Sequence, residues 1–230
     1  MKIVAVRIGD RYGPEYETYL ESKLPEHEIV WVREPFDPRV NLQWNKMVGM
    51  RMDVDEPICV IDIDILLIND YQKIFDYPIE RGQFLAAPEW WRWGFKDLET
   101  RFTINGGFYK YYPKDCRYIY DKFMRNPLHW QTYYIKEGFT TGPVNGEQHF
   151  VNDAVLQQLE LIRLPNEWFC KMEARPDVEL SLSKINTRFK EVTGHSYAYL
   201  GGQFWPTISF VHFTHAANIP HMWDDYKLFV

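Results

Sequence analysis

Cysteine is scarce in this sequence, and long apolar segments are missing. The three cysteines, Cys59, Cys116 and Cys170, lie far apart and form no CxxC motif, which argues against a disulfide framework or a zinc site and fits a reducing compartment. The apolar run at residues 1–8 is too short for a signal peptide and is interrupted by Arg7. Because no stretch reaches the length of a membrane span, we expect a soluble, cytoplasmic protein.

Positive charge is also in short supply. The formal net charge is −6, which argues against a nucleic-acid binder that relies on phosphate neutralisation. No internal repeat or low-complexity segment is visible, and 230 residues with 46% hydrophobic content suffice for one sizeable domain. The aromatic content of 17% is high and suits either a packed core or a sugar-stacking surface.

The first part of the chain has the pattern of a parallel sheet. Apolar runs predict strands at residues 2–8, 28–32 and 58–61, and helical spacing predicts helices at residues 15–23 and 40–52 between them. This β-α-β-α-β order is typical of parallel strands joined by crossover helices. It predicts an α/β fold with a Rossmann-like N-terminal half.

The pattern beyond residue 70 is looser, which predicts a central sheet that becomes mixed. Residues 126–141 are aromatic-rich and irregular in pattern, and residues 172–206 carry few clear signals. The other elements expected here are helices at residues 71–75, 114–125 and 146–159 and strands at residues 84–87, 102–104, 107–112, 160–164 and 207–213.

Two carboxylates follow the apolar run at residues 58–61. The period of a strand places Asp62 and Asp64 on one face, with Ile63 pointing away. Neighbouring carboxylates repel each other and are costly to bury, and a divalent cation such as Mg²⁺ or Mn²⁺ relieves both costs. Ligands of open α/β sheets bind at the carboxyl ends of the strands, where this pair lies. The alternative is a solvated strand end with two harmless acids.

Two glycine-containing stretches also lie near strand ends. Residues 9–12 follow the first predicted strand, where a nucleotide base could lie on the ring of Tyr12; an ordinary strand-to-helix turn is the alternative. Asn105 and Gly106 have the sequence of a tight hairpin turn. Glycine also permits close approach of the backbone to a ligand, with the Asn105 amide as a hydrogen-bonding group.

Two further stretches carry polar side chains of ambiguous role. Glu147 opens a predicted helix and would complement its dipole, or it could join Gln148 in binding sugar hydroxyls. His212 lies at the end of the last predicted strand, on the opposite face from Val211 and Phe213. A lone histidine is more often structural than a ligand, but at a strand end it can complete a metal site.

Taken in order, these stretches resemble the glycogenin-like retaining glycosyltransferases of family 8, which have the GT-A fold. The resemblance implies a single catalytic domain over residues 1–230, with a nucleotide-binding half at residues 1–70 and a donor-sugar and acceptor half at residues 71–230. It also implies transfer of glucose or galactose from a UDP-sugar, with retention at the anomeric carbon and with Mn²⁺, or alternatively Mg²⁺, as the cofactor.

The resemblance assigns a role to each matching residue. Asp62, Asp64 and His212 would hold the metal on the donor diphosphate, the Tyr12 ring would stack on uracil, and Lys46 would contact the donor ribose or phosphate. The implied donor-binding set comprises Val6, Ile8, Gly9, Asp10, Tyr12, Lys46, Asp62, Ile63, Asp64, Asn105, Gly106, Glu147, Gln148, His212, His215 and Asn218.

The catalytic candidates that the resemblance implies are Asn105, Glu147 and Gln148, close to the donor sugar. Glu147 stands where an aspartate is usual, and it is the carboxylate of these motifs that is placed to act as a nucleophile. Gln148 is a weak alternative, since an amide oxygen is a poor nucleophile. Retention can arise by double displacement or by same-face attack within an ion pair, and we favour same-face attack.

The C-terminal motif matches only in part. His215 stands where a glycine is usual, and Asn218 stands where a phosphate-binding lysine is usual. His221 or another cation would therefore have to stabilise the leaving phosphate, or turnover would be slow. Aromatic side chains at residues 88–93 and 126–141 are expected to form the acceptor walls.

Two other functions fit parts of the pattern. An Asp-x-Asp after an apolar strand also resembles the haloacid-dehalogenase phosphatases, but Leu66 replaces the usual threonine or valine and the motif does not follow the first strand. A non-catalytic sugar-binding protein is the third hypothesis, and the missing tail lysine favours it. Hydrolysis of an aryl phosphate would indicate the phosphatase, and metal-independent sugar binding would indicate the sugar-binding protein.

Overall fold

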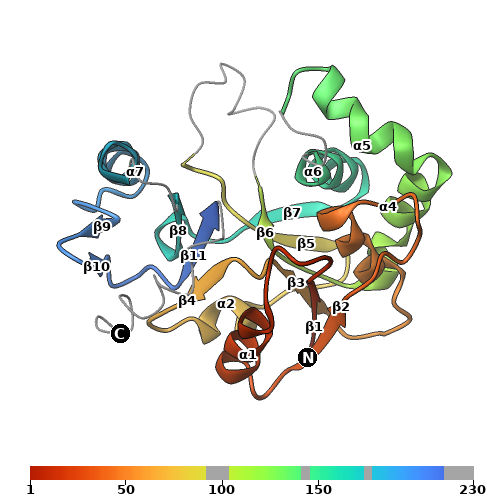
Figure 1. Cartoon of the computed structure of the whole chain (residues 1–230), viewed down its shortest axis with the longest axis horizontal. Helices are drawn as coiled ribbons and strands as arrows, with labels where there is room; N and C mark the ends of the chain where they lie inside the picture. The colour runs from red at the N-terminus through yellow and green to blue at the C-terminus, as the bar shows by residue number, and fades with distance from the viewer. Residues whose placement is uncertain (92–103, 141–145, 174–177, 215–230) are drawn as a thin grey trace.

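A six-stranded mixed sheet forms the centre of the protein (Figure 1). The computed structural model describes residues 1–91, 104–140, 146–173 and 178–214. In their spatial order, the strands are β2 (Glu28–Val32), β1 (Lys2–Val6), β3 (Ile58–Ile61), β6 (Asn105–Tyr111), β5 (Gln83–Ala87) and β7 (Glu160–Arg163). β1 runs parallel to β2 and β3, β6 runs antiparallel to β3 and β5, and β7 runs parallel to β5. The predicted α/β fold with a central mixed sheet is therefore confirmed.

Both faces of this sheet are buried, because apolar side chains point to either side of its strands. In β1, Ile3 and Ala5 belong to one core and Val4 belongs to the other. The core of Ile3 includes side chains of α1 (Pro14–Lys23) and α2 (Gln72–Asp76). The core of Val4 is covered by η1 (Leu42–Arg51), α4 (Pro113–Arg125), α5 (Pro127–Lys136) and α6 (Glu147–Gln158).

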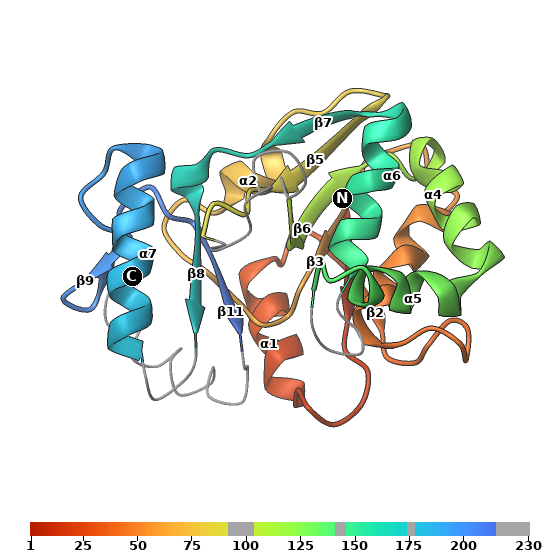
Figure 2. The same ribbon diagram turned by 90° about the horizontal axis from the view of Figure 1, so that it is seen from above.

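A second, three-stranded sheet begins directly after Asp64. Its order is β4 (Ile65–Leu67), β11 (Phe210–Thr214) and β8 (Phe169–Glu173), with β11 antiparallel to β4 and parallel to β8. This sheet and α7 (Val178–Thr193) lie on one side of the molecule, and α4, α5 and α6 lie on the other (Figure 2). The remaining elements are η2 (Asn166–Trp168) and the short hairpin of β9 (Tyr199–Leu200) and β10 (Gln203–Phe204).

Three segments differ from the sequence prediction. The helix expected at residues 40–52 is a 3-10 helix, η1, in which the Asn45 side chain donates to the Leu42 carbonyl at 2.9 Å and competes with α-helical bonding. Residues 126–141 contain α5, which begins at Pro127 and is capped by Asn126, whose side chain accepts from the His129 amide. Residues 172–206 contain α7, which buries Ile185 and Phe189.

The Asn105-Gly106 stretch is not a hairpin turn. Both residues belong to β6, which starts at Asn105, and the strand expected at residues 102–104 lies almost wholly outside the described residues. Trp90 and Trp91, expected to line an acceptor wall, are buried in the core, where the indole of Trp90 donates to the carbonyls of Asn166 and Phe169. None of the described helices has both the length and the apolar character that crossing a membrane requires.

Candidate active site

A cavity of about 840 Å³ opens at the carboxyl ends of β1 and β3. It lies where the sequence predicts a ligand site in an α/β sheet. Of the predicted site residues, His215 and Asn218 lie outside the described residues. All the others line the cavity: Val6, Ile8, Gly9, Asp10, Tyr12, Lys46, Asp62, Ile63, Asp64, Asn105, Gly106, Glu147, Gln148 and His212.

The turn between β3 and β4 carries the two carboxylates. Asp62 and Asp64 lie just outside the strands, and Ile63 between them is buried in the core. The amide of Asp62 donates to the Gly107 carbonyl at 3.0 Å, and the amide of Phe213 donates to the Asp64 carbonyl at 2.9 Å. Backbone hydrogen bonds to both sheets therefore fix the positions of these two residues.

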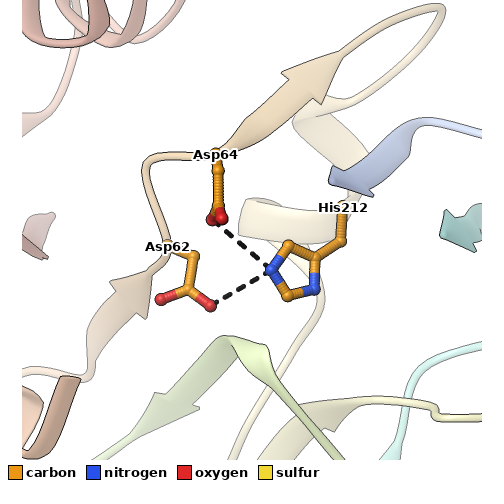
Figure 3. A group of neighbouring side chains, drawn as sticks. All are labelled: Asp62, Asp64 and His212. Atoms are coloured by element: carbon orange, nitrogen blue, oxygen red, sulfur yellow. Dashed lines mark ion pairs between the residues drawn. The ribbon is translucent and has the colours of Figure 1, made fainter. Parts of the chain in front are cut away.

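His212 is brought to the carboxylates by β11. It pairs with Ile65 of β4, one residue beyond Asp64. Its Nε2 atom lies 3.4 Å from Asp62 Oδ2 and 3.4 Å from Asp64 Oδ1 (Figure 3). The three side chains can offer ligand atoms that all lie within 4.8 Å of one another.

This cluster fits a divalent cation. Two carboxylate oxygens and one imidazole nitrogen converge on one place, and imidazole suits transition metals better than Mg²⁺. Burial disfavours a charged Asp64, but the neighbouring His212 and Lys46 outweigh this effect and lower the pKa of its carboxyl group. Asp64 is therefore held as a carboxylate, the form that a metal ligand needs.

Lys46 is a buried cation behind the cluster. Its Nζ atom lies 2.5 Å from Asp62 Oδ1 and 3.9 Å from Glu147 Oε2, and it donates to the Gly106 carbonyl at 2.7 Å. Burial alone would lower the pKa of Lys46, but Asp62 and Glu147 outweigh that effect and raise it. In this structure Lys46 orients Asp62 and links it to the start of α6.

Gly106 and Gly107 allow the backbone of β6 to approach these groups closely. A Cβ atom at Gly106 would lie 3.0 Å from Glu147 Oε2. A Cβ atom at Gly107 would lie 2.7 Å from Asn105 Oδ1 and 3.3 Å from His212 Nδ1. The glycines serve close packing of the backbone against these side chains rather than a turn; close approach to a ligand stays a prediction.

Gln148 is clamped between two partners. Its Oε1 atom accepts from the Gly106 amide at 3.2 Å, and its Nε2 atom donates to Glu89 Oε1 at 2.9 Å. These bonds hold the amide in one orientation, with its oxygen toward β6. Glu89, in the 88–93 stretch that was expected to form an acceptor wall through its aromatic residues, also lines the cavity.

Glu147 is a buried carboxyl group with a raised pKa. It is 3% exposed, and its Oε1 atom has no hydrogen-bond partner among the described residues. Burial raises the pKa of Glu147 to about 7; Lys46 opposes this shift and Asp62 adds to it. Its carboxyl group therefore changes charge near neutral pH.

Tyr12 connects the turn after β1 to the carboxylates. Its hydroxyl donates to Asp64 Oδ2 at 3.1 Å, and the Arg11 guanidinium lies over its ring at 5.4 Å from the centroid. Burial and the nearby Asp64 raise the pKa of the Tyr12 hydroxyl, so it stays protonated as a donor. Gly9, with φ of 77°, allows the sharp turn that brings Tyr12 to this position.

Other cavity residues were not among the predicted site residues. Lys171 of β8 and His149 of α6 line the cavity, and the sequence offers no signal for Lys171 because only the pairing of β8 with β11 brings it there. Thr140 is the part of the 126–141 segment that reaches the cavity among the described residues. None of the aromatic residues in the described part of this segment is among the residues that line this cavity, and the acceptor wall stays a prediction.

Comparison with known proteins supports the fold. No protein-family model matches the sequence, and a search of curated proteins finds no significant match. The galactosyltransferase LgtC, solved in complex with donor and acceptor sugar analogues, is similar with a TM-score of 0.54 and 10% identity, over 100% of this chain and 96% of that chain. The glycosyltransferase GlyE of Streptococcus pneumoniae TIGR4 gives a TM-score of 0.55 and 11% identity, over 100% of this chain but 61% of GlyE. The chain therefore has the GT-A fold of these glycosyltransferases.

Proposed function

We propose that this chain is a metal-dependent, retaining glycosyltransferase that moves a hexose from UDP-glucose or UDP-galactose to an acceptor. The observation that carries the proposal is the Asp62, Asp64 and His212 cluster, which lines a cavity of about 840 Å³ on a GT-A fold. The structure of LgtC with donor and acceptor sugar analogues supports a sugar donor for a fold of this kind.

Asp62, Asp64 and His212 would hold the metal, for which we propose Mn²⁺ in preference to Mg²⁺ because of the imidazole nitrogen. When bound, such an ion acts as a Lewis acid on the diphosphate. The residues behind the cluster keep it in place: Lys46 holds Asp62, and the Tyr12 hydroxyl holds Asp64. The cluster thus needs little rearrangement to accept a cation.

The two halves of the chain would bind different parts of the donor. In residues 1–70, the Tyr12 ring and the turn at Gly9 and Asp10 would bind uracil. Uracil would stack on the face of the Tyr12 ring that Arg11 leaves open, or on the other face once Arg11 moves away. In residues 71–230, Asn105, Gly106, Glu147 and Gln148 would surround the hexose. The acceptor would bind in the part of the same cavity that the donor leaves empty.

Retention would proceed by same-face attack. The bond between the anomeric carbon and the diphosphate oxygen breaks, and its electron pair leaves with UDP. The acceptor hydroxyl attacks from the side that UDP vacates and gives its proton to the departing diphosphate oxygen. The Gln148 oxygen is held by the Gly106 amide, and the Glu147 carboxyl is partly protonated near neutral pH, so neither is a strong nucleophile there. Both side chains instead position the hexose.

A thermal-shift screen tests this proposal. UDP-glucose, UDP-galactose, GDP-sugars and sugars alone are compared with and without Mn²⁺, because a ligand of the native state raises the melting temperature. We expect a shift for a UDP-sugar only with Mn²⁺, and loss of that shift in Asp64→Asn. The matched control is Asp53→Asn, whose carboxylate is exposed. A shift from sugar alone without metal would instead favour the sugar-binding protein.

A further inference from the structure

The cavity contains more carboxylates than lysines and arginines, although its proposed ligand is an anion. Among the described lining residues, the acids are Asp10, Asp62, Asp64, Glu89 and Glu147, and the lysines and arginines are Arg11, Lys46 and Lys171. The charge of a divalent ion is largely offset by the two carboxylates that hold it. A nucleoside diphosphate, which adds further negative charge as it departs, therefore needs another cation nearby.

Two of the three cations are positioned for other parts of the site. Lys46 is bound to Asp62 and to the Gly106 carbonyl, and removing it would leave Asp62 and Glu147 without their buried partner. Arg11 lies over the Tyr12 ring, at the turn after β1, where the base would bind. Neither is placed primarily for the diphosphate.

Lys171 is placed beside the metal cluster by strand pairing. In the parallel pairing of β8 with β11, Lys171 is the register partner of His212. Partners in neighbouring parallel strands point their side chains to the same face of the sheet. β8 lies alongside β11 in both views (Figures 1 and 2), and Lys171 and His212 line the same cavity.

We propose that Lys171 binds the diphosphate of the donor nucleotide next to the Asp62, Asp64 and His212 cluster. A lysine ammonium is a point charge with three donors on a flexible stem, which suits phosphate oxygens. As the bond to the anomeric carbon breaks, the electron pair moves onto the diphosphate, and Lys171 neutralises this charge without transferring its proton. The inference rests on the proposed function, since it requires a nucleoside diphosphate donor.

Calorimetry with UDP and uridine, both with Mn²⁺, separates the diphosphate from the rest of the ligand. We expect Lys171→Gln to weaken UDP binding roughly 10- to 100-fold, as for loss of a charged hydrogen bond, and to leave uridine binding unchanged. Lys171→Arg, which keeps the charge, should retain most of the affinity for UDP. Lys190→Gln on the exposed side of α7 is the matched control and should change neither.

Three outcomes overturn the inference, and they can be told apart. UDP affinity of Lys171→Gln within twofold of the wild type would show that Lys171 does not bind the diphosphate. Equal losses for UDP and uridine would show that the substitution disturbs the cavity as a whole. If the wild type itself fails to bind UDP with Mn²⁺, the proposed function fails and this inference fails with it.

Discussion

Glu147 shows how a single buried side chain can couple the site to pH. Its pKa rises from 4.5 to about 7, mainly because burial disfavours the charged form. Between these two values the folded protein keeps a proton that the unfolded chain has lost. The free energy of unfolding therefore falls as the pH rises through this window, and the full penalty is present above about pH 7.

Replacing Glu147 with glutamine should remove this penalty. We expect Glu147→Gln to raise the free energy of unfolding by roughly 1–3 kcal/mol at pH 8, with the gain shrinking toward pH 5. Lys46 retains Asp62 and the Gly106 carbonyl as partners, so its own charge stays compensated. Urea unfolding at the two pH values measures the difference. An equal gain in the free energy of unfolding at both pH values would contradict the raised pKa. The control is Glu137→Gln, at an exposed position.

His212 should set the metal preference. An imidazole nitrogen favours Mn²⁺ over Mg²⁺, whereas the carboxylates of Asp62 and Asp64 accept either ion. We expect His212→Ala to weaken Mn²⁺ binding in the presence of UDP at least about tenfold and to weaken Mg²⁺ binding less. Calorimetry with each ion measures the ratio, with the exposed His129→Ala as the control. Equal losses for both ions would remove His212 from the ligand set.

At the scale of elements, the close approach of β6 to β11 depends on Gly107. A Cβ atom there would lie 2.7 Å from Asn105 Oδ1 and 3.3 Å from His212 Nδ1, so Gly107→Ala must displace one of them. We expect a loss of about 1–3 kcal/mol in the free energy of unfolding together with weaker Mn²⁺ binding. Gly13→Ala is the control, because its crowding atoms belong to the Glu15 side chain, which can move.

Denaturant unfolding and Mn²⁺ titration together check this prediction. If Gly107→Ala binds Mn²⁺ as the wild type does, the contact between β6 and His212 does not control the metal cluster. If Gly13→Ala loses as much stability as Gly107→Ala, the loss is a general effect of crowding at a glycine and is not specific to the close approach of β6 to β11.

Short-range sequence patterns within single elements are enough to identify Asp62 and Asp64 as candidate site residues. The apolar run before them predicts a buried strand, and a strand end in such a sheet predicts a ligand site, so both inferences need only neighbouring residues. His212 lies far from Asp62 and Asp64 in the sequence, and its position beside them depends on the pairing of β11 with β4. Lys171 depends in turn on the pairing of β8 with β11, which no local pattern reports.

The missed helices had weaker but real signals. The Asn126-Pro127 pair is typical of a helix start, but the aromatic residues that follow obscure the helical pattern because they pack on one another and on α6. In α7, Ile185 and Phe189 lie at helical spacing on its buried side, but polar residues dilute the pattern. Among the described residues, the core contains many aromatic side chains, including Trp90 and Trp91.

At the scale of the whole molecule, the cavity is assembled from distant parts of the chain. The turn after β1, η1, the β3–β4 turn, β6, α6 and β11 each supply lining residues. The arrangement of residues 1–70 can be predicted from their β-α-β order, but the junction of the two sheets at Asp64 depends on tertiary contacts. A ligand that spans these parts stabilises the whole fold by mass action, about 2.7 kcal/mol at a concentration of 100 Kd.

The most direct test of the central claim is release of UDP from UDP-glucose and UDP-galactose, measured with Mn²⁺ and with a chelator. We predict release by the wild type with one of these donors and Mn²⁺, loss of release with the chelator, and a fall of at least about 100-fold in Asp64→Asn but not in Asp53→Asn. The claim would be contradicted by metal-independent release, by release that Asp64→Asn leaves intact, or by hydrolysis of an aryl phosphate in place of UDP release.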